Sequence, residues 1–142
     1  MNLSSDILKE ISEQLDCGFR AFIHKTSMEL IFIPDTNDLP DIDMDEWEEE
    51  TELLDNNFTE YHEIDKWTTS DAFDMMMEFA DKLDNNEKLQ NRLLDALRMR
   101  KPFREFKFVI DNSGVYRQKW FDFKNQWQIN YVDEYFKRLT SL

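Results

Sequence analysis

The pattern that decides the fold is a pair of short apolar runs, FRAFIH at residues 19–24 and ELIFIP at residues 29–34, separated only by KTSM. Both runs are rich in β-branched and aromatic residues, which favour strands, and a four-residue connection is typical of a β-hairpin. Pro34 cannot donate a hydrogen bond to a sheet and ends the second run. A third run, Phe58 to Ile64, alternates between two sets of side chains and predicts a further, half-exposed strand.

Helical periodicity dominates the rest of the chain. Apolar residues between Ser4 and Leu15 recur every three or four positions, and Gly18 suits the left-handed conformation that ends many helices. The same spacing predicts helices over residues 69–83, 86–100, 102–111 and 115–139, and a shorter acidic helix over 44–55. We therefore predict an α+β fold: a small antiparallel sheet of two or three strands packed on about five helices, with a helical C-terminal half.

Length and composition limit the class of protein. The 142 residues are enough for one hydrophobic core, so we expect a single domain spanning residues 1–142. No apolar run approaches the roughly 20 residues that cross a bilayer, and the first residues lack the pattern of a secretion signal. The one cysteine, Cys17, cannot form an internal disulfide. These features predict a cytoplasmic protein that does not bind membranes.

Charge is distributed very unevenly along the chain. Residues 1–71 contain 20 acidic and 4 basic side chains, whereas residues 72–142 contain 11 acidic and 13 basic ones. Residues 35–55 alone contain 11 acidic side chains and no basic one. Such a surface attracts basic partners, so we predict an acidic interaction face. The residues predicted to form it are Asp41, Asp43, Asp45, Glu46, Glu49 and Glu50.

The acidic stretch also invites comparison with a calcium-binding loop. Asp41, Asp43, Asp45 and Glu52 occupy positions 1, 3, 5 and 12, where that loop places oxygen ligands. However, glutamate stands at position 6, where the sharp turn requires glycine, and again at position 8, which is usually apolar. We favour a solvated acidic loop that leads into a helix whose first turn is stabilised by acidic side chains. No metal site is predicted.

Basic residues alternate with phenylalanines later in the chain, and residues 98–124 contain 8 basic against 3 acidic side chains. Cations can hold phosphates while an aromatic ring stacks on a base, which makes nucleic-acid binding an alternative function. Against it, Phe103 and Phe106 have helical spacing and fit a core, and the net charge of −14 repels nucleic acid. Pairing with the acidic half, within the molecule or across a dimer, is simpler. The candidate contact residues are Arg98, Arg100, Lys101, Arg104, Lys107, Arg117 and Lys119.

Catalytic motifs are absent from the sequence. His24 and His62 both lie on predicted strands, but no third ligand or nucleophile is spaced to join them. There is no glycine-rich phosphate loop, no Gly-x-Ser-x-Gly turn and no His-Glu-x-x-His helix. We predict no catalytic residue and no cofactor. A hydrolase or metal enzyme would require both histidines in one pocket together with carboxylates.

One segment carries a family resemblance. KPFREFK at residues 101–107, followed by WFDF at 120–123, resembles the signature of a bacterial group, Uncharacterised Protein Family 0158. The hairpin at 19–34 and the helix that begins near Ser70 are similar too, so the resemblance covers nearly the whole chain. This chain departs from the pattern at Lys101-Pro102 and in lacking a hairpin glycine. The resemblance implies a bacterial, cytosolic protein and assigns no catalytic residue.

The leading functional hypothesis is a non-enzymatic interaction or regulatory domain. Its acidic N-terminal face would recognise a basic partner protein or mimic the charge of nucleic acid. The alternative is a nucleic-acid-associated protein that uses the basic aromatic segment at residues 98–124.

Overall fold

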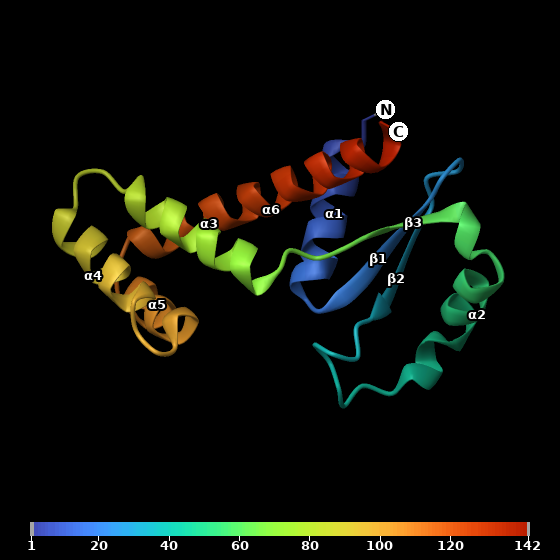
Figure 1. Ribbon diagram of the computed structural model, residues 1–142, viewed down its shortest axis with the longest axis horizontal. Helices are drawn as coiled ribbons and strands as arrows, with labels where there is room; N and C mark the ends of the chain where they lie inside the picture. The colour runs from blue at the N-terminus through green and yellow to red at the C-terminus, as the bar shows by residue number, and fades with distance from the viewer. Residues whose placement is uncertain (1, 142) are drawn as a thin grey trace. The chain divides into compact units, whose positions relative to one another are not determined.

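Six α-helices and one three-stranded antiparallel sheet make up residues 2–141, the part of the chain that the computed structural model describes (Figure 1). The α+β class and the helical C-terminal half are therefore confirmed. The helices are α1 (Ser5–Asp16), α2 (Glu48–Asn56), α3 (Thr69–Asp81), α4 (Glu87–Leu97), α5 (Pro102–Asp111) and α6 (Tyr116–Thr140). The strands are β1 (Phe19–His24), β2 (Leu30–Pro34) and β3 (Tyr61–Ile64), and two 3-10 turns are η1 (Met44–Trp47) and η2 (Phe58–Glu60).

The chain divides into two compact units. The sheet unit contains Met1–Lys66 and Ile129–Leu142, and the helical unit contains Trp67–Gln128. Helix α6 supplies its first half to the helical unit and its second half to the sheet unit. Each unit has its own group of buried side chains. The single domain expected from chain length stays a prediction.

The hairpin expected at residues 19–34 is confirmed. Strand β1 pairs with β2 in antiparallel register, and Ala21 lies opposite Phe32. Before the hairpin, Gly18 adopts the left-handed conformation with φ +94° and ends α1. The hairpin turn contains no glycine, and Met28 takes the left-handed conformation instead, with φ 63°. The ring nitrogen Nδ1 of His24 accepts hydrogen bonds from the backbone N–H groups of Thr26 and Ser27, which holds this turn.

The third strand is shorter than predicted. Only Tyr61–Ile64 pairs with β1, from His24 facing Tyr61 to Ala21 facing Ile64, and the order across the sheet is β2-β1-β3. The prediction is wrong for residues 58–60, which form the 3-10 turn η2. The reason is that β1 ends at His24, so the ladder has no strand to continue along.

The two faces of the sheet are covered by different helices (Figure 1). Alternation along the strands places Ala21, Ile23 and Ile64 on one face, where all three are buried and α1 packs against β1. Phe22 and Ile33 lie on the opposite face and form a buried cluster with Leu54 of α2. The second face therefore positions the acidic helix.

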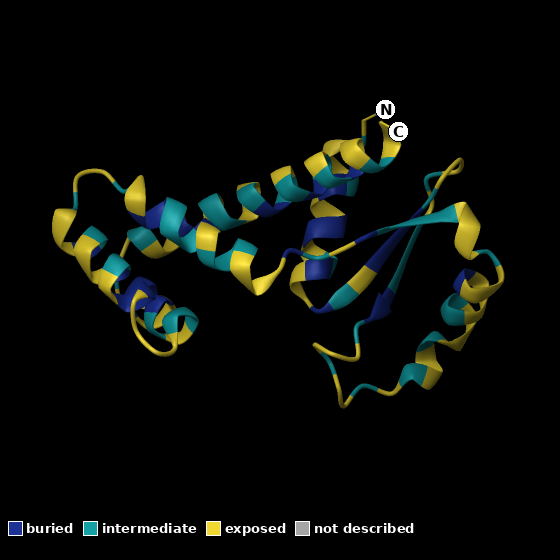
Figure 2. Ribbon diagram, in the orientation of Figure 1, coloured by how far each residue is buried: buried dark blue, intermediate teal, exposed yellow. Residues whose placement is uncertain are grey.

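The helical unit has the larger core. Helices α3, α4 and α5 and the first half of α6 surround a buried cluster in which Phe106 is fully buried and Trp120 nearly so. The ring of Trp120 lies 4.9 Å from that of Phe106 and 5.3 Å from that of Phe79, both edge-on. The capping box at Thr68 and Asp71 fixes the start of α3. Figure 2 shows the buried residues on the inner sides of α4 and α5.

No helix within residues 2–141 combines the length and apolar character that crossing a membrane requires.

Candidate interaction surfaces

The acidic stretch becomes an exposed surface on η1, α2 and the loop before them. We call this the acidic surface. Its carboxylates are exposed, and none forms an ion pair with a lysine or arginine of residues 2–141. Five of the six carboxylates predicted for an acidic face belong to it. Its members are Asp41, Asp43, Asp45, Glu46, Glu48, Glu49 and Glu52.

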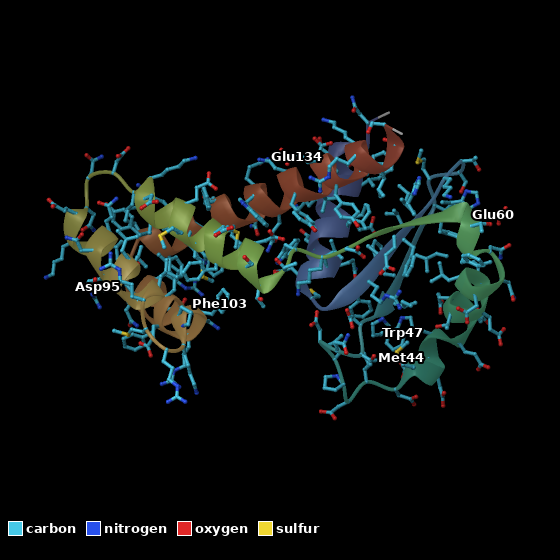
Figure 3. All side chains as sticks on the ribbon, viewed as in Figure 1. Met44, Trp47, Glu60, Asp95, Phe103 and Glu134 are labelled. Atoms are coloured by element: carbon cyan, nitrogen blue, oxygen red, sulfur yellow. The ribbon has the colours of Figure 1, made fainter. Side chains whose placement is uncertain are left out.

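Local structure explains why these residues form a turn and a helix. The Asp43 side chain accepts a hydrogen bond from the N–H of Asp45 and caps η1, at 3.0 Å. Three glutamates occupy the first turn of α2, where the helix dipole favours negative charge. On the inner side Trp47 points from η1 towards the sheet, its ring 5.9 Å from that of Phe19 (Figure 3). The acidic residues are thereby left on the outer side.

Glu50, the sixth predicted member, is placed differently. Its side chain is half-buried, and its Oε2 atom is buried without a hydrogen-bond partner among residues 2–141. A buried oxygen cannot contact a partner protein directly. Glu50 therefore turns one carboxylate oxygen inward and presents less charge to a partner than the seven members of the acidic surface.

Apolar side chains are exposed next to the acidic surface. Leu53 is 45% exposed and lies one helical turn after Glu49, and Phe58 in η2 is 74% exposed. Phe58 also lines a cleft of about 310 Å³ between α2 and the sheet, with Leu54 and Tyr61 among the other lining residues. The alternation of residues 58–64 predicts Phe58 as the start of a strand, so the sequence pattern alone does not reveal this exposed ring.

An ion pair forms part of the same cleft. The guanidinium of Arg20 donates two hydrogen bonds to the carboxylate of Glu63, both at 3.0 Å. This pair raises the pKa of Arg20, the hydrogen bond to Glu63 being the largest cause. Because its cation and carboxylate neutralise each other, this part of the cleft wall carries no net charge. Asp55 of α2, which also lines the cleft and is exposed, adds negative charge beside the acidic surface.

Five of the seven predicted basic contacts lie at the end of α4, in the following turn and on α5. The predicted helix at 86–100 ends at Leu97, so Arg98, Arg100 and Lys101 lie in or beside a tight turn. Arg104 and Lys107 project from the outer side of α5, where all basic side chains are exposed. Arg98 and Arg104 lie 3.8 and 3.9 Å from Asp95 and Glu105, beyond hydrogen-bond range.

An exposed aromatic ring accompanies these cations. Phe108 is 63% exposed and follows Arg104 by one helical turn, so both lie on one side of α5. Phe106 is fully buried, as expected for a core residue, whereas Phe103, also on α5 (Figure 3), is only half-buried. We call Arg98, Arg100, Lys101, Arg104, Lys107 and Phe108 the basic surface.

The remaining two predicted contacts belong to α6 and are engaged locally. Arg117 donates to Asp111 at 3.2 Å, and its guanidinium lies 4.7 Å from the ring centre of Phe121. The ammonium of Lys119 lies 5.0 Å from the ring centre of Tyr116. These contacts link α6 to the end of α5 and order its first turns. The structure therefore does not group them with the basic surface.

The two histidines lie on opposite faces of the sheet. His62 pairs with Ile23 of β1, so these two side chains lie on the same face of the sheet. His24 follows Ile23 directly in β1 and therefore points to the other face. They consequently share no pocket, which removes the condition set for a hydrolase or metal enzyme centred on them. Among residues 2–141, no three His, Cys, Asp or Glu side chains are grouped so that they could hold a metal ion.

Comparison with known proteins identifies the family. Residues 2–139 match the Uncharacterised protein family (UPF0158). The chain belongs to this family. The resemblance drawn from the sequence is thus confirmed. No curated protein and no solved structure matches the chain.

The segment that resembles UPF0158 has two structural roles here. Pro102 occupies the first turn of α5, and Phe106 packs edge-on against Trp120, so these residues build the core of the helical unit. Arg104 and Lys107, from the same segment, lie outside on the basic surface. The UPF0158 signature in this chain therefore combines a packing element with an exposed cationic face.

Proposed function

We propose that the protein is a non-enzymatic, cytoplasmic interaction domain whose acidic surface recognises a basic segment of a partner protein. The observation that supports this most directly is the combination on and beside α2. Seven exposed carboxylates without an ion-pair partner within residues 2–141 lie next to exposed Leu53 and Phe58. Charge alone is common on a protein surface. Charge beside exposed aromatic and aliphatic side chains is typical of a protein-binding surface.

Not every carboxylate of the acidic surface stabilises α2. Glu48 and Glu49 lie at the start of α2, where negative charge is favourable, but Glu52 lies one turn after Glu48 and repels it. A cationic partner would relieve this repulsion on binding. The carboxylates would speed encounter through long-range attraction, while Leu53 and Phe58 would supply apolar contact area.

The test is the binding of a fluorescent peptide of alternating lysine and phenylalanine residues, followed by anisotropy at increasing salt. The wild-type protein is compared with the triple variant Glu48→Gln, Glu49→Gln, Glu52→Gln. The matched control is Asp74→Asn, Asp81→Asn, Glu87→Gln, which removes three exposed negative charges from the helical unit. Its net charge therefore equals that of the triple variant on α2.

We expect the triple variant on α2 to lose at least about tenfold in affinity, equivalent to about 1.4 kcal/mol. The control should lose less than half of that free energy, and binding by the wild type should weaken steeply as salt screens the charges. Equal losses in the two variants would show that only net charge matters and would contradict a specific acidic surface. A wild type that does not bind at low salt would contradict the function itself.

A further inference from the structure

The outer face of α5 departs from an ordinary amphipathic pattern. Its inner face supplies Phe106, Val109 and Ile110 to the core, and its outer face carries Arg104 and Lys107. Phe108 lies among these outer cations with 63% of its surface exposed. A phenylalanine left in water forgoes burial worth about 1.5–3 kcal/mol, so this ring is positioned for contact with something outside its own core.

The cations of the basic surface are available for external partners. Arg100, Lys101 and Lys107 form no ion pair with any other residue of the described chain. The pairs of Arg98 with Asp95 and Arg104 with Glu105 are long, and both arginine side chains remain more than 70% exposed. Such surface pairs hold their partners weakly. Met99, in the same turn, is 53% exposed and extends the apolar contact area.

The acidic surface has the complementary composition. On α2, Glu49 is followed one turn later by exposed Leu53; on α5, Arg104 is followed one turn later by exposed Phe108. Each helix thus presents charge of one sign and an apolar side chain on the same exposed side. The signs are opposite, so the two surfaces match each other in charge and both offer an apolar group to bury.

We propose that the basic surface of one copy of this chain docks on the acidic surface of another, so that copies associate head to tail. This inference rests on the proposed function, because it names a second copy as one basic partner. Two different surfaces meet in such an interface, so association extends into rings or open chains instead of ending at a symmetric dimer.

Nucleic acid is the competing occupant of the basic surface. Its phosphates would suit the cations, but the chain carries a net charge of −14, which repels a polyanion at long range. Between residues 98 and 108 only Phe108 offers a well-exposed ring, because Phe106 belongs to the core and Phe103 is half-buried. Single-stranded nucleic acids are usually held by several stacking rings in a groove. Charge complementarity within the same chain favours a second copy.

The experiment measures molecular mass by sedimentation velocity over a range of protein concentrations, at about 50 mM and about 500 mM salt. The basic-surface variant is Arg104→Gln, Lys107→Gln, and the acidic-surface variant is Glu48→Gln, Glu49→Gln, Glu52→Gln. The matched control is Lys88→Gln, Arg92→Gln, which removes two exposed cations from α4. Circular dichroism confirms that each variant is folded.

We expect the wild type and the α4 control to exceed the 17.3 kDa of a single chain at low salt, increasingly with concentration, and to return to it at high salt. Each surface variant alone should stay close to the mass of one chain. An equimolar mixture of the two variants should form a 1:1 complex, because each retains the surface that the other lacks.

Several outcomes would overturn the inference. A wild type that stays monomeric at low salt but binds the lysine–phenylalanine peptide contradicts head-to-tail association and leaves the proposed function standing. A wild type that neither associates nor binds the peptide contradicts both. A monomeric wild type that binds fluorescent single-stranded DNA, with binding lost in the Arg104→Gln, Lys107→Gln variant, assigns the basic surface to nucleic acid instead.

Discussion

The sheet unit and the helical unit differ in both charge and packing. The sheet unit contains 21 acidic and 6 basic residues, and the helical unit contains 10 acidic and 11 basic ones. The helical unit is organised around one extended buried cluster. In the sheet unit, by contrast, α2 is attached through a small cluster in which its only buried residue is Leu54. The element that carries the most charge is thus among the least anchored, as expected if it serves binding more than stability.

The sharpest way to test this difference is to remove a large side chain from the helical core. Phe106→Ala deletes a fully buried ring that contacts Trp120, and we expect a loss of about 3–5 kcal/mol in the free energy of unfolding. Urea denaturation followed by tryptophan fluorescence and circular dichroism measures it. The control is Phe108→Ala on the same helix, which should change stability by less than about 0.5 kcal/mol because its ring is exposed.

The same experiment examines the single-domain prediction. Helix α6 contributes to both units, so we expect the two spectroscopic signals to change together in a single transition. If Phe106→Ala produced two separate transitions, the helical and sheet units would be independent folding units and the prediction of one domain would be wrong.

A smaller effect is expected from the attachment of α2. Leu54→Ala removes the one buried side chain of this helix, at a cost near the lower end of core truncations, about 2 kcal/mol. Hydrogen exchange should show protection lost in residues 48–56 first, with the helical unit retaining its protection. Leu53→Ala, which alters an exposed neighbour, is the control. Uniform loss of protection in both units after Leu54→Ala would contradict a weakly anchored α2.

The smallest effect concerns pH and is confined to the sheet unit. Burial, and to a lesser extent the charge of Lys25, lower the pKa of His62 below its usual 6.5. The unfolded chain therefore binds a proton more readily than the folded one. Stability should be fully present above about pH 6.5 and decline as the pH falls through the lowered pKa.

Two variants isolate this contribution in urea titrations between about pH 7 and pH 5. His62→Gln should show a shallower decline than the wild type. Lys25→Gln removes only the smaller of the two causes that lower the pKa of His62, so this variant should retain most of the decline in stability. If His62→Gln followed the wild-type curve, other groups would account for the pH dependence of the sheet unit.

Much of the fold was predictable from local patterns. Ser4 and Pro102 mark the starts of α1 and α5, and Gly18 follows the end of α1. These boundaries follow from capping and backbone preferences that act within a few residues, and each lies at or within two residues of the predicted place. The error at Phe58 has a non-local cause. Whether residues 58–60 form a strand depends on where β1 ends, and their own alternation contains no information about that.

The candidate site was only partly predictable for a similar reason. The sign and place of the charges are visible in the sequence, so most of the exposed carboxylates and five of the exposed cations could be named from it, and their role in binding stays a prediction. Burial of the Glu50 Oε2 atom, exposure of Phe58 and Phe108, and the local engagement of Arg117 depend on tertiary packing. Likewise, separation of the two histidines depends on strand register.

We propose that a basic partner binds at the acidic surface itself and is not held merely by the net negative charge of the whole chain. Amide chemical shifts recorded while the lysine–phenylalanine peptide is added test it most directly. We predict that the changes concentrate in residues 41–58, around Glu49, Leu53 and Phe58. Changes of equal size around the exposed carboxylates of the helical unit, such as Asp74 and Glu87, would contradict it.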